Sequence, residues 1–102
     1  MRIKKKKASK ELNVFRTGQV LKYQDRDGSS SEYIEYIKIE RPYDNYDGGP
    51  ARVWSVSLWS DEEKIWRKSL TTFTRGNNFL LTYYRDVSPL EQLLVFGETY
   101  SA

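Results

Sequence analysis

The residues able to do chemistry are restricted from the outset, because this 102-residue chain contains no histidine and no cysteine. These absences exclude a Ser-His-Asp triad, imidazole and thiolate metal ligands, a cysteine nucleophile and a disulfide. The carboxylates fall in predicted turns, where hydration leaves nothing to raise a pKa for general acid catalysis. The sequence also lacks a phosphate-binding glycine-rich loop and a nucleophile elbow. We therefore expect a binding protein with no enzymatic activity, metal or cofactor.

Residues 1–10 form a basic arm that contains no acidic residue. Its positive side chains are Arg2, Lys4, Lys5, Lys6, Lys7 and Lys10. A run of like charges without apolar neighbours repels itself, so we expect this arm to be disordered. Clustered positive charge neutralises phosphates and releases counterions, which gives salt-dependent, sequence-independent affinity for nucleic acid. A solvated tail, a nuclear localisation signal and a patch for anionic lipid are the alternatives.

The remainder of the chain is slightly acidic. The whole chain has 17 basic and 14 acidic residues, and subtracting the six of the arm leaves 11 basic and 14 acidic residues, a net charge of −3. No apolar run approaches the roughly 20 residues that cross a bilayer. The arm is not followed by the apolar stretch of a secretory signal. We expect an intracellular, cytoplasmic location and no membrane contact.

Residues 11–102 are predicted to form a single β-rich domain. Aromatic residues make up 15% of the chain, and β-branched residues beside them favour sheet over helix. Clusters of Gly, Pro, Asp and Asn separate short apolar segments, as in an antiparallel meander. The predicted strands cover residues 14–24, 32–41, 52–59, 64–74 and 78–85.

The end of the chain predicts a helix instead. Ser88 is a suitable N-cap, Pro89 suits the first helical position, and Glu91 follows the cap by three residues. Gly97 is the expected stop, which gives a helix of about eight residues. Three leucines and the preceding Val87 recur at helical spacing: Leu90, Leu93 and Leu94. We expect this apolar side to cover one end of the sheet.

Two predicted hairpins place their apolar side chains on one face of the sheet. With residues 61–63 as the first loop, Leu58 faces Trp66 in the same layer as Trp54. A turn at residues 76–77 then adds Leu81 to that face. The expected fold is mainly β: a small five-stranded antiparallel barrel, SH3-like or OB-like, or a curved sheet, with a short C-terminal α-helix. Pairing of two copies through an uncovered edge strand stays open.

The opposite face of the predicted sheet carries Trp59, Arg67 and Tyr84 among small hydroxyl side chains. Single-stranded nucleic acid stacks its bases on such rings, with roughly 1–3 kcal/mol per base, while cations follow the phosphates. The alternative is an ordinary solvated face, with Trp59 and Ile65 as a cross-strand pair. Together with the basic arm, this face favours a small non-enzymatic nucleic-acid-binding accessory protein, either single-strand-specific or nonspecific.

The predicted loop over residues 42–50 indicates a different partner. It places Tyr43 and Tyr46 beside Asp44 and Asp47. Loop tyrosines are common protein contacts, whereas the neighbouring carboxylates repel phosphate. The alternative function is therefore a protein-binding module, an inhibitor or adaptor, that acts through its acidic body and this loop. The aspartates lack the spacing of a calcium loop, so turn formation explains them.

Overall fold

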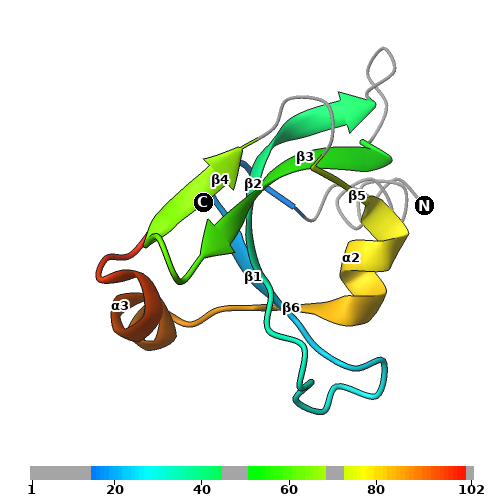
Figure 1. Cartoon of the computed structure of the whole chain (residues 1–102). Coiled ribbons are helices and arrows are strands. Elements are labelled where there is room, and N and C mark those ends of the chain that lie inside the picture. Colours follow the sequence, from blue (N-terminus) through cyan, green and yellow to red (C-terminus); the bar gives the residue numbers. More distant parts are fainter. Residues whose placement is uncertain (1–14, 45–50, 69–72, 101–102) are drawn as a thin grey trace, which may run out of the picture.

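One antiparallel sheet forms the centre of the molecule, and a short helix packs against each of its two faces (Figure 1). The structure is a computed structural model that describes residues 15–44, 51–68 and 73–100. Its elements are β1 (Val20–Tyr23), β2 (Tyr36–Asp44), β3 (Val53–Ser60), β4 (Ile65–Lys68), β5 (Thr74–Gly76), α2 (Asn77–Tyr83), β6 (Tyr84–Asp86) and α3 (Pro89–Phe96). Neither of these two helices is long and apolar enough to cross a bilayer.

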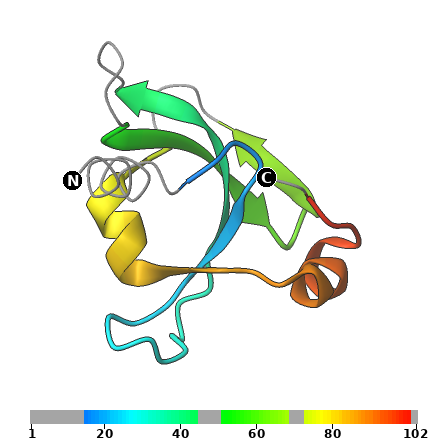
Figure 2. The same cartoon turned by 180° about the vertical axis from the view of Figure 1, so that it is seen from behind.

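The strands follow the order β4-β3-β2-β1-β6, and β5 pairs with the first part of β3. Two register shifts in the β2–β3 pairing mark irregularities of the bulge type, which bend a strand and increase its twist. β6 runs between the two helices along the β1 edge (Figure 2). The mainly β class with a C-terminal helix is confirmed. The described pairings leave the sheet open, so they do not form the predicted barrel.

The first core cluster fills the concave side of the sheet beneath α2. Side chains alternate across a strand, so Trp54 and Val56 of β3 point to this side together. The buried members are Phe15, Leu21, Ile37, Ile39, Ala51, Trp54, Val56, Leu80 and Tyr84. Each fully buried aliphatic side chain contributes roughly 1.5–3 kcal/mol, which makes this cluster the main source of stability.

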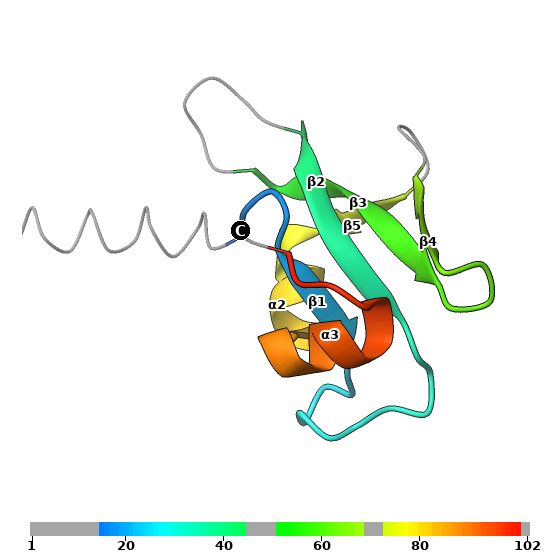
Figure 3. The same ribbon diagram turned by 90° about the vertical axis from the view of Figure 1, so that its left-hand side faces the viewer.

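The second cluster lies on the other side of the sheet, where α3 covers it (Figure 3). Its buried residues are Val20, Tyr36 and Val87. Partly buried side chains pack around them: Trp59, Trp66, Val95, Phe96 and Tyr100. Phe96 is the central ring, because its centroid lies 4.9 Å from both tryptophans and 5.3 Å from Tyr36. The C-terminal helix is therefore held by aromatic contacts.

The predicted strand at residues 78–85 is wrong, because this segment forms α2 followed by β6. Gly76, expected in a hairpin turn, is the extended N-cap of α2, with φ −69° and ψ 148°. Asn77 is buried, and its Oδ1 accepts a hydrogen bond of 3.0 Å from Trp54 Nε1. Leu80 is fully buried in the first core cluster. These tertiary contacts override the strand preference of the aromatic residues.

The predicted register of the β3–β4 hairpin is wrong by one residue. Trp59 pairs with Trp66, and Ser60 pairs with Ile65. Lys64, expected to be the first residue of the strand, has φ 58° and belongs to the turn, where its N–H donates to the Ser60 carbonyl. Because the side-chain period is two, this slip transfers Trp66 to the face opposite Leu58. The face assigned to Trp54 and Leu58 is correct.

Strand boundaries also differ from the prediction. The first strand begins at Val20 instead of residue 14, because Gly18, with φ 91°, directs the chain through a turn. β2 begins at Tyr36 and continues through Pro42 into the segment expected to be a loop. The predicted strand at residues 64–74 appears as β4 and β5, and residues 69–72 between them lie outside the described part of the chain.

The limits of α3 confirm the prediction, whereas its orientation contradicts it. Ser88 Oγ accepts a hydrogen bond of 3.2 Å from the Glu91 N–H, and Gly97 ends the helix with φ 80°. However, the leucines expected to cover the sheet are exposed: Leu90 by 66%, Leu93 by 51% and Leu94 by 78%. The buried residue of this helix is Gln92. Helical spacing shows which residues share a side, and the hydrogen bonds of Gln92 decide which side faces inward.

Candidate functional site

Trp59, the predicted stacking residue, is a packing residue of the second cluster. Its ring centroid lies 5.2 Å from that of Trp66 and 4.9 Å from that of Phe96. Its Nε1 donates to Asp61 Oδ1 over 3.4 Å. The face is also less open than expected, since Ser57 is fully buried and donates to the Glu40 carboxylate. α3 therefore occupies the surface that was predicted for bases.

Arg67 and Tyr84 do not lie beside Trp59. Arg67 pairs with Leu58 across the hairpin, and its guanidinium forms an ion pair with Glu63. Tyr84 is 7% exposed and belongs to the first core cluster on the other side of the sheet. The shifted register and the formation of α2 separate the three side chains. Their role in nucleic-acid binding stays a prediction, without a common face to support it.

The other predicted contacts fall partly outside the described residues. The whole basic arm and Tyr46 lie there. Tyr43 is described: it is 51% exposed and belongs to the end of β2 instead of a loop. In the described ranges, no group of three or more acidic side chains is placed to hold a metal ion.

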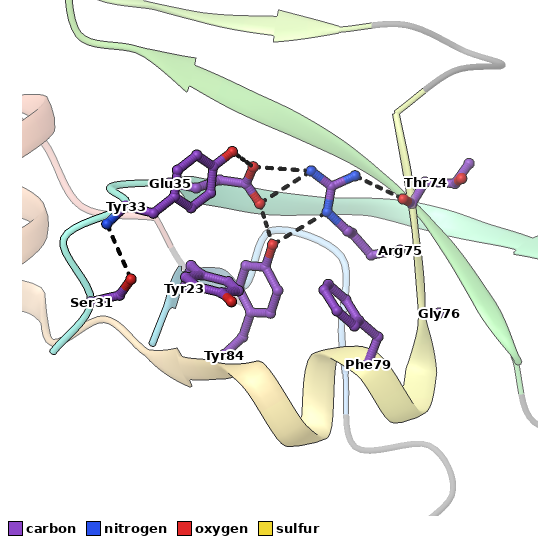
Figure 4. Close-up of a pocket in the computed structure, with 9 residues that line it drawn as sticks. All are labelled: Tyr23, Ser31, Tyr33, Glu35, Thr74, Arg75, Gly76, Phe79 and Tyr84. Carbon is purple, nitrogen blue, oxygen red and sulfur yellow. Dashed lines mark hydrogen bonds and ion pairs between the residues drawn. The ribbon is translucent and has the colours of Figure 1, made fainter. Parts of the chain in front are cut away.

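A pocket of about 510 Å³ lies between the loop that joins β1 to β2, strand β5 and helix α2, and we call it the aromatic pocket (Figure 4). Its lining residues are Tyr23, Ser31, Tyr33, Glu35, Thr74, Arg75, Gly76, Phe79 and Tyr84. The volume is typical of small-ligand and peptide side-chain sites. These residues come from four segments of the chain, and their sequence spacing carries no motif. The sequence therefore gave no signal for this pocket.

The floor of the aromatic pocket is a satisfied polar cluster around Glu35 (Figure 4). Arg75 Nη2 lies 3.1 Å from each carboxylate oxygen of Glu35. The Tyr33 hydroxyl donates to Oε1 over 2.9 Å, and the Tyr84 hydroxyl donates to Oε2. Arg75 also donates through Nη1 to the Thr74 carbonyl over 2.9 Å. Both oxygens of the Glu35 carboxylate are therefore hydrogen-bonded within the cluster.

The polar cluster fixes the protonation of its tyrosines. Burial, followed by the hydrogen bond to Glu35, raises the pKa of Tyr84 above its ordinary value. The bond to Glu35 is also the main cause that raises the pKa of Tyr33. Burial opposes the charge of Arg75, but its contacts with Tyr84 and Glu35 leave its pKa raised. Both hydroxyls therefore stay donors, and the floor has no net charge.

The walls of the pocket are aromatic rings in mutual contact. Tyr23 lies at the centre, with ring centroids of Tyr33, Tyr83 and Tyr84 at 5.4, 6.0 and 5.5 Å. Phe79 completes the wall from α2, 5.8 Å from Tyr84. The outer rings are open to solvent, since Tyr33 is 59% exposed and Phe79 is 43% exposed. Ring faces are thus available to a ligand.

The loop that joins β1 to β2 is acidic, and we call it the rim because its last residues line the pocket. The loop between β1 and β2 reaches the pocket at Ser31 and contains Asp25, Asp27 and Glu32 against a single Arg26. Asp27 Oδ1 accepts hydrogen bonds from the N–H and Oγ of Ser29, at 2.9 and 2.7 Å. These bonds lower the pKa of Asp27 and order the turn. Within this loop Ser31, Tyr33 and Glu35 line the pocket, so Glu32 is the rim carboxylate that adjoins the lining along the chain.

A second candidate surface is the leucine face of α3, formed by Leu90, Leu93 and Leu94. Gln92 fixes the rotation of the helix, because its Nε2 donates to the Val87 carbonyl and its Oε1 accepts from the Tyr100 N–H. The distances are 2.9 and 2.8 Å. A large apolar patch on the surface of a small protein is typical of an interaction site.

Comparisons with known proteins return nothing: no protein-family model matches the chain, and neither the curated proteins nor the solved structures give a significant match.

Proposed function

We propose that this chain is a non-enzymatic protein-binding module of the adaptor type, and that the leucine face of α3 is its contact surface. The exposure of Leu90, Leu93 and Leu94 is the observation that carries the proposal. A helix of a monomer normally buries its leucines and exposes its glutamine, and here the order is reversed. A curved sheet is sufficient for this role, and closure into an SH3-like or OB-like barrel stays a prediction.

Charge near the leucine face favours a different protein over a second copy. Residues 85–100 contain Asp86, Glu91 and Glu98 against Arg85, a net charge of −2. Two copies joined through α3 would bring these charges together, and like charges across an interface oppose association. A partner with an apolar groove and a basic border complements the surface. The slightly acidic body agrees with such a partner.

The test compares the wild-type chain with a Leu93→Gln/Leu94→Gln variant and with Leu81→Gln as the matched control. Leu81 is similarly exposed but lies on α2. Glutamine keeps helix propensity, so both variants should remain within about 0.5 kcal/mol of the wild-type stability. Partners captured from the source are purified and titrated against the three proteins.

We expect the α3 variant to lose at least about tenfold in affinity, whereas the control retains it. Equal affinity of all three proteins for the partner contradicts the proposal. The absence of any partner whose binding can be measured also contradicts it. Light scattering of the wild type tests whether a second copy of the chain binds the leucine face. A dimer that the α3 variant abolishes would assign the leucine face to self-association.

Nucleic-acid capture by the basic arm is the second candidate, and its support is the six positive charges in residues 1–10. Without a common face for Trp59, Arg67 and Tyr84, we propose this activity in an arm-only form. Binding of a single-stranded oligothymidylate should fall by roughly two orders of magnitude between about 50 and 200 mM salt. Deletion of residues 1–10 should abolish it, and Trp59→Ala should not change it. Failure of the intact chain to bind the oligothymidylate at low salt would rule out this candidate.

A further inference from the structure

We propose that the aromatic pocket binds a proline-rich segment in the polyproline II conformation, with a basic residue next to the prolines. This site lies on the α2 side of the sheet, apart from the leucine face, so it would give the chain a second protein contact. The inference does not depend on the leucine face, and the two are tested with different variants.

The floor of the pocket excludes a charged group as the inserted part of the ligand. Glu35 is already bonded to Arg75, Tyr33 and Tyr84, so it offers no free carboxylate to an incoming cation. Arg75 is committed to Glu35 in turn, and the acidic rim repels a phosphate. The inserted part must therefore be uncharged.

The walls of the pocket fit proline rings. Proline-rich segments bind in aromatic-lined grooves, where their flat, preformed rings pack on aromatic faces at a small entropic cost. Tyr33 and Phe79 provide exposed ring faces, with Tyr23 between them and Tyr84 at the floor. A polyproline II backbone has no internal hydrogen bonds, so its carbonyls need donors. The Ser31 hydroxyl and the Tyr23 hydroxyl line the same pocket and can supply them.

The rim determines the flanking charge. Asp25, Asp27 and Glu32 lie on the loop that ends at the pocket, and their only basic neighbour within that loop is Arg26. A lysine or arginine beside the prolines meets this negative charge, whereas an acidic residue is repelled. Exposed charges of this kind change affinity less than ring contacts do. The prolines supply the affinity, and the basic residue supplies selectivity.

The test titrates the full chain with capped peptides of eight prolines that carry arginine at one end, at the other end, or at neither. A peptide with glutamate in place of arginine and a Gly-Ser peptide with arginine are the ligand controls. We expect the better arginine peptide to bind at least about threefold more tightly than octaproline, and the glutamate peptide to bind most weakly of the proline peptides. The Gly-Ser peptide should not bind.

Protein variants locate the site. Tyr33→Ala and Phe79→Ala should each weaken binding at least about tenfold, because each removes an exposed ring of the pocket. Tyr43→Ala is the matched control, since Tyr43 is equally accessible but lies outside the pocket. Glu32→Gln should weaken the arginine peptide and leave octaproline unchanged.

Three results would overturn the proposal. The first is no binding of any proline peptide to the folded wild type at millimolar concentration. The second is equal binding of the Gly-Ser peptide. The third is equal loss in Tyr33→Ala and Tyr43→Ala. Displacement of the peptide by oligothymidylate would instead assign the pocket to nucleic acid. A leucine-face variant should bind the peptides normally, so failure here is distinguishable from failure of the proposed function.

Discussion

Two aromatic clusters lie on opposite sides of the same sheet. The closed cluster is the second core cluster beneath α3, and the open cluster is the set of rings around the aromatic pocket. In the closed cluster, Phe96 of α3 packs against both Trp59 and Trp66, and Trp66 Nε1 donates to the Tyr100 hydroxyl over 2.9 Å. Lys38 Nζ covers its outer side, 4.9 Å from the ring centre of Trp66. In the open cluster, α2 adds Tyr83, whose ring stacks on Tyr23, and Phe79 at the edge, and the rings surround the aromatic pocket.

Aromatic content alone therefore does not define a binding surface. Both clusters combine rings with hydrogen-bonding groups, and both were built from residues typical of strands. What differs is whether a neighbouring element covers the rings: Phe96 of α3 packs on both tryptophans, whereas Tyr33 and Phe79 stay exposed to solvent. Where it does, the rings contribute stability, and where it does not, they remain available to a ligand.

The largest expected effect is the contrast between Phe96→Ala and Phe79→Ala. Phe96 contacts four aromatic residues at the centre of the closed cluster, so its removal should lower the free energy of unfolding by about 3 kcal/mol. Phe79 is a half-exposed wall of the open cluster, and its removal should cost less than about 1 kcal/mol. Urea denaturation of both variants measures the difference. Equal losses would remove the distinction between the clusters.

The dependence of stability on alkaline pH tests the role of Tyr36 in the closed cluster. The Tyr36 hydroxyl donates to Glu91 Oε2 over 2.8 Å, and burial together with this bond raises the pKa of Tyr36 to about 12. In the unfolded chain tyrosine ionises near pH 10, so the unfolded state loses its proton first. This stabilisation is complete below pH 10 and is lost as the pH rises towards 12, by roughly 2 kcal/mol at most.

Denaturation midpoints measured from pH 8 to 12 test this linkage. Tyr36→Phe should show a shallower decline than the wild type, while Tyr43→Phe, which changes an exposed tyrosine, should follow the wild type. A decline that is identical in all three proteins would show that Tyr36 is not protected in the closed cluster.

The smallest expected effect concerns the cap of α3, the element that closes the cluster. Ser88→Ala removes the hydrogen bond from the Glu91 N–H to Ser88 Oγ and should cost about 1 kcal/mol. Ser88→Asp retains an acceptor and should be close to the wild type. Neither change should alter binding at the aromatic pocket, which lies on the other side of the sheet. A change in peptide affinity would show that the two clusters are coupled.

Local signals in the sequence predicted α3 well and α2 not at all. Ser88, Pro89 and Gly97 act through the backbone of their immediate neighbours, so their pattern specifies both ends of the helix. α2 lacks an N-cap side-chain hydrogen bond and contains aromatic residues that favour strands. Its helical state depends on the buried contacts of Asn77 and Leu80, which come from distant strands.

The candidate site could not be read from the sequence for a related reason. The prediction placed Arg67 beside Trp59 through a register that one turn residue, Lys64, changes, and it placed Tyr84 there through a strand that forms α2 and β6 instead. The aromatic pocket assembles Tyr33, Glu35, Arg75 and Phe79 from segments that no local pattern connects.

By itself, the sequence determined the mainly β class, the absence of histidine and cysteine chemistry, the division of charge between arm and body, and the ends of α3. These properties follow from composition or from contacts between near neighbours in the chain. Only the tertiary structure decided which side of α3 faces inward, which tryptophans are covered and where a pocket remains. Each of these depends on contacts between residues far apart in the chain, and periodicity does not encode such contacts.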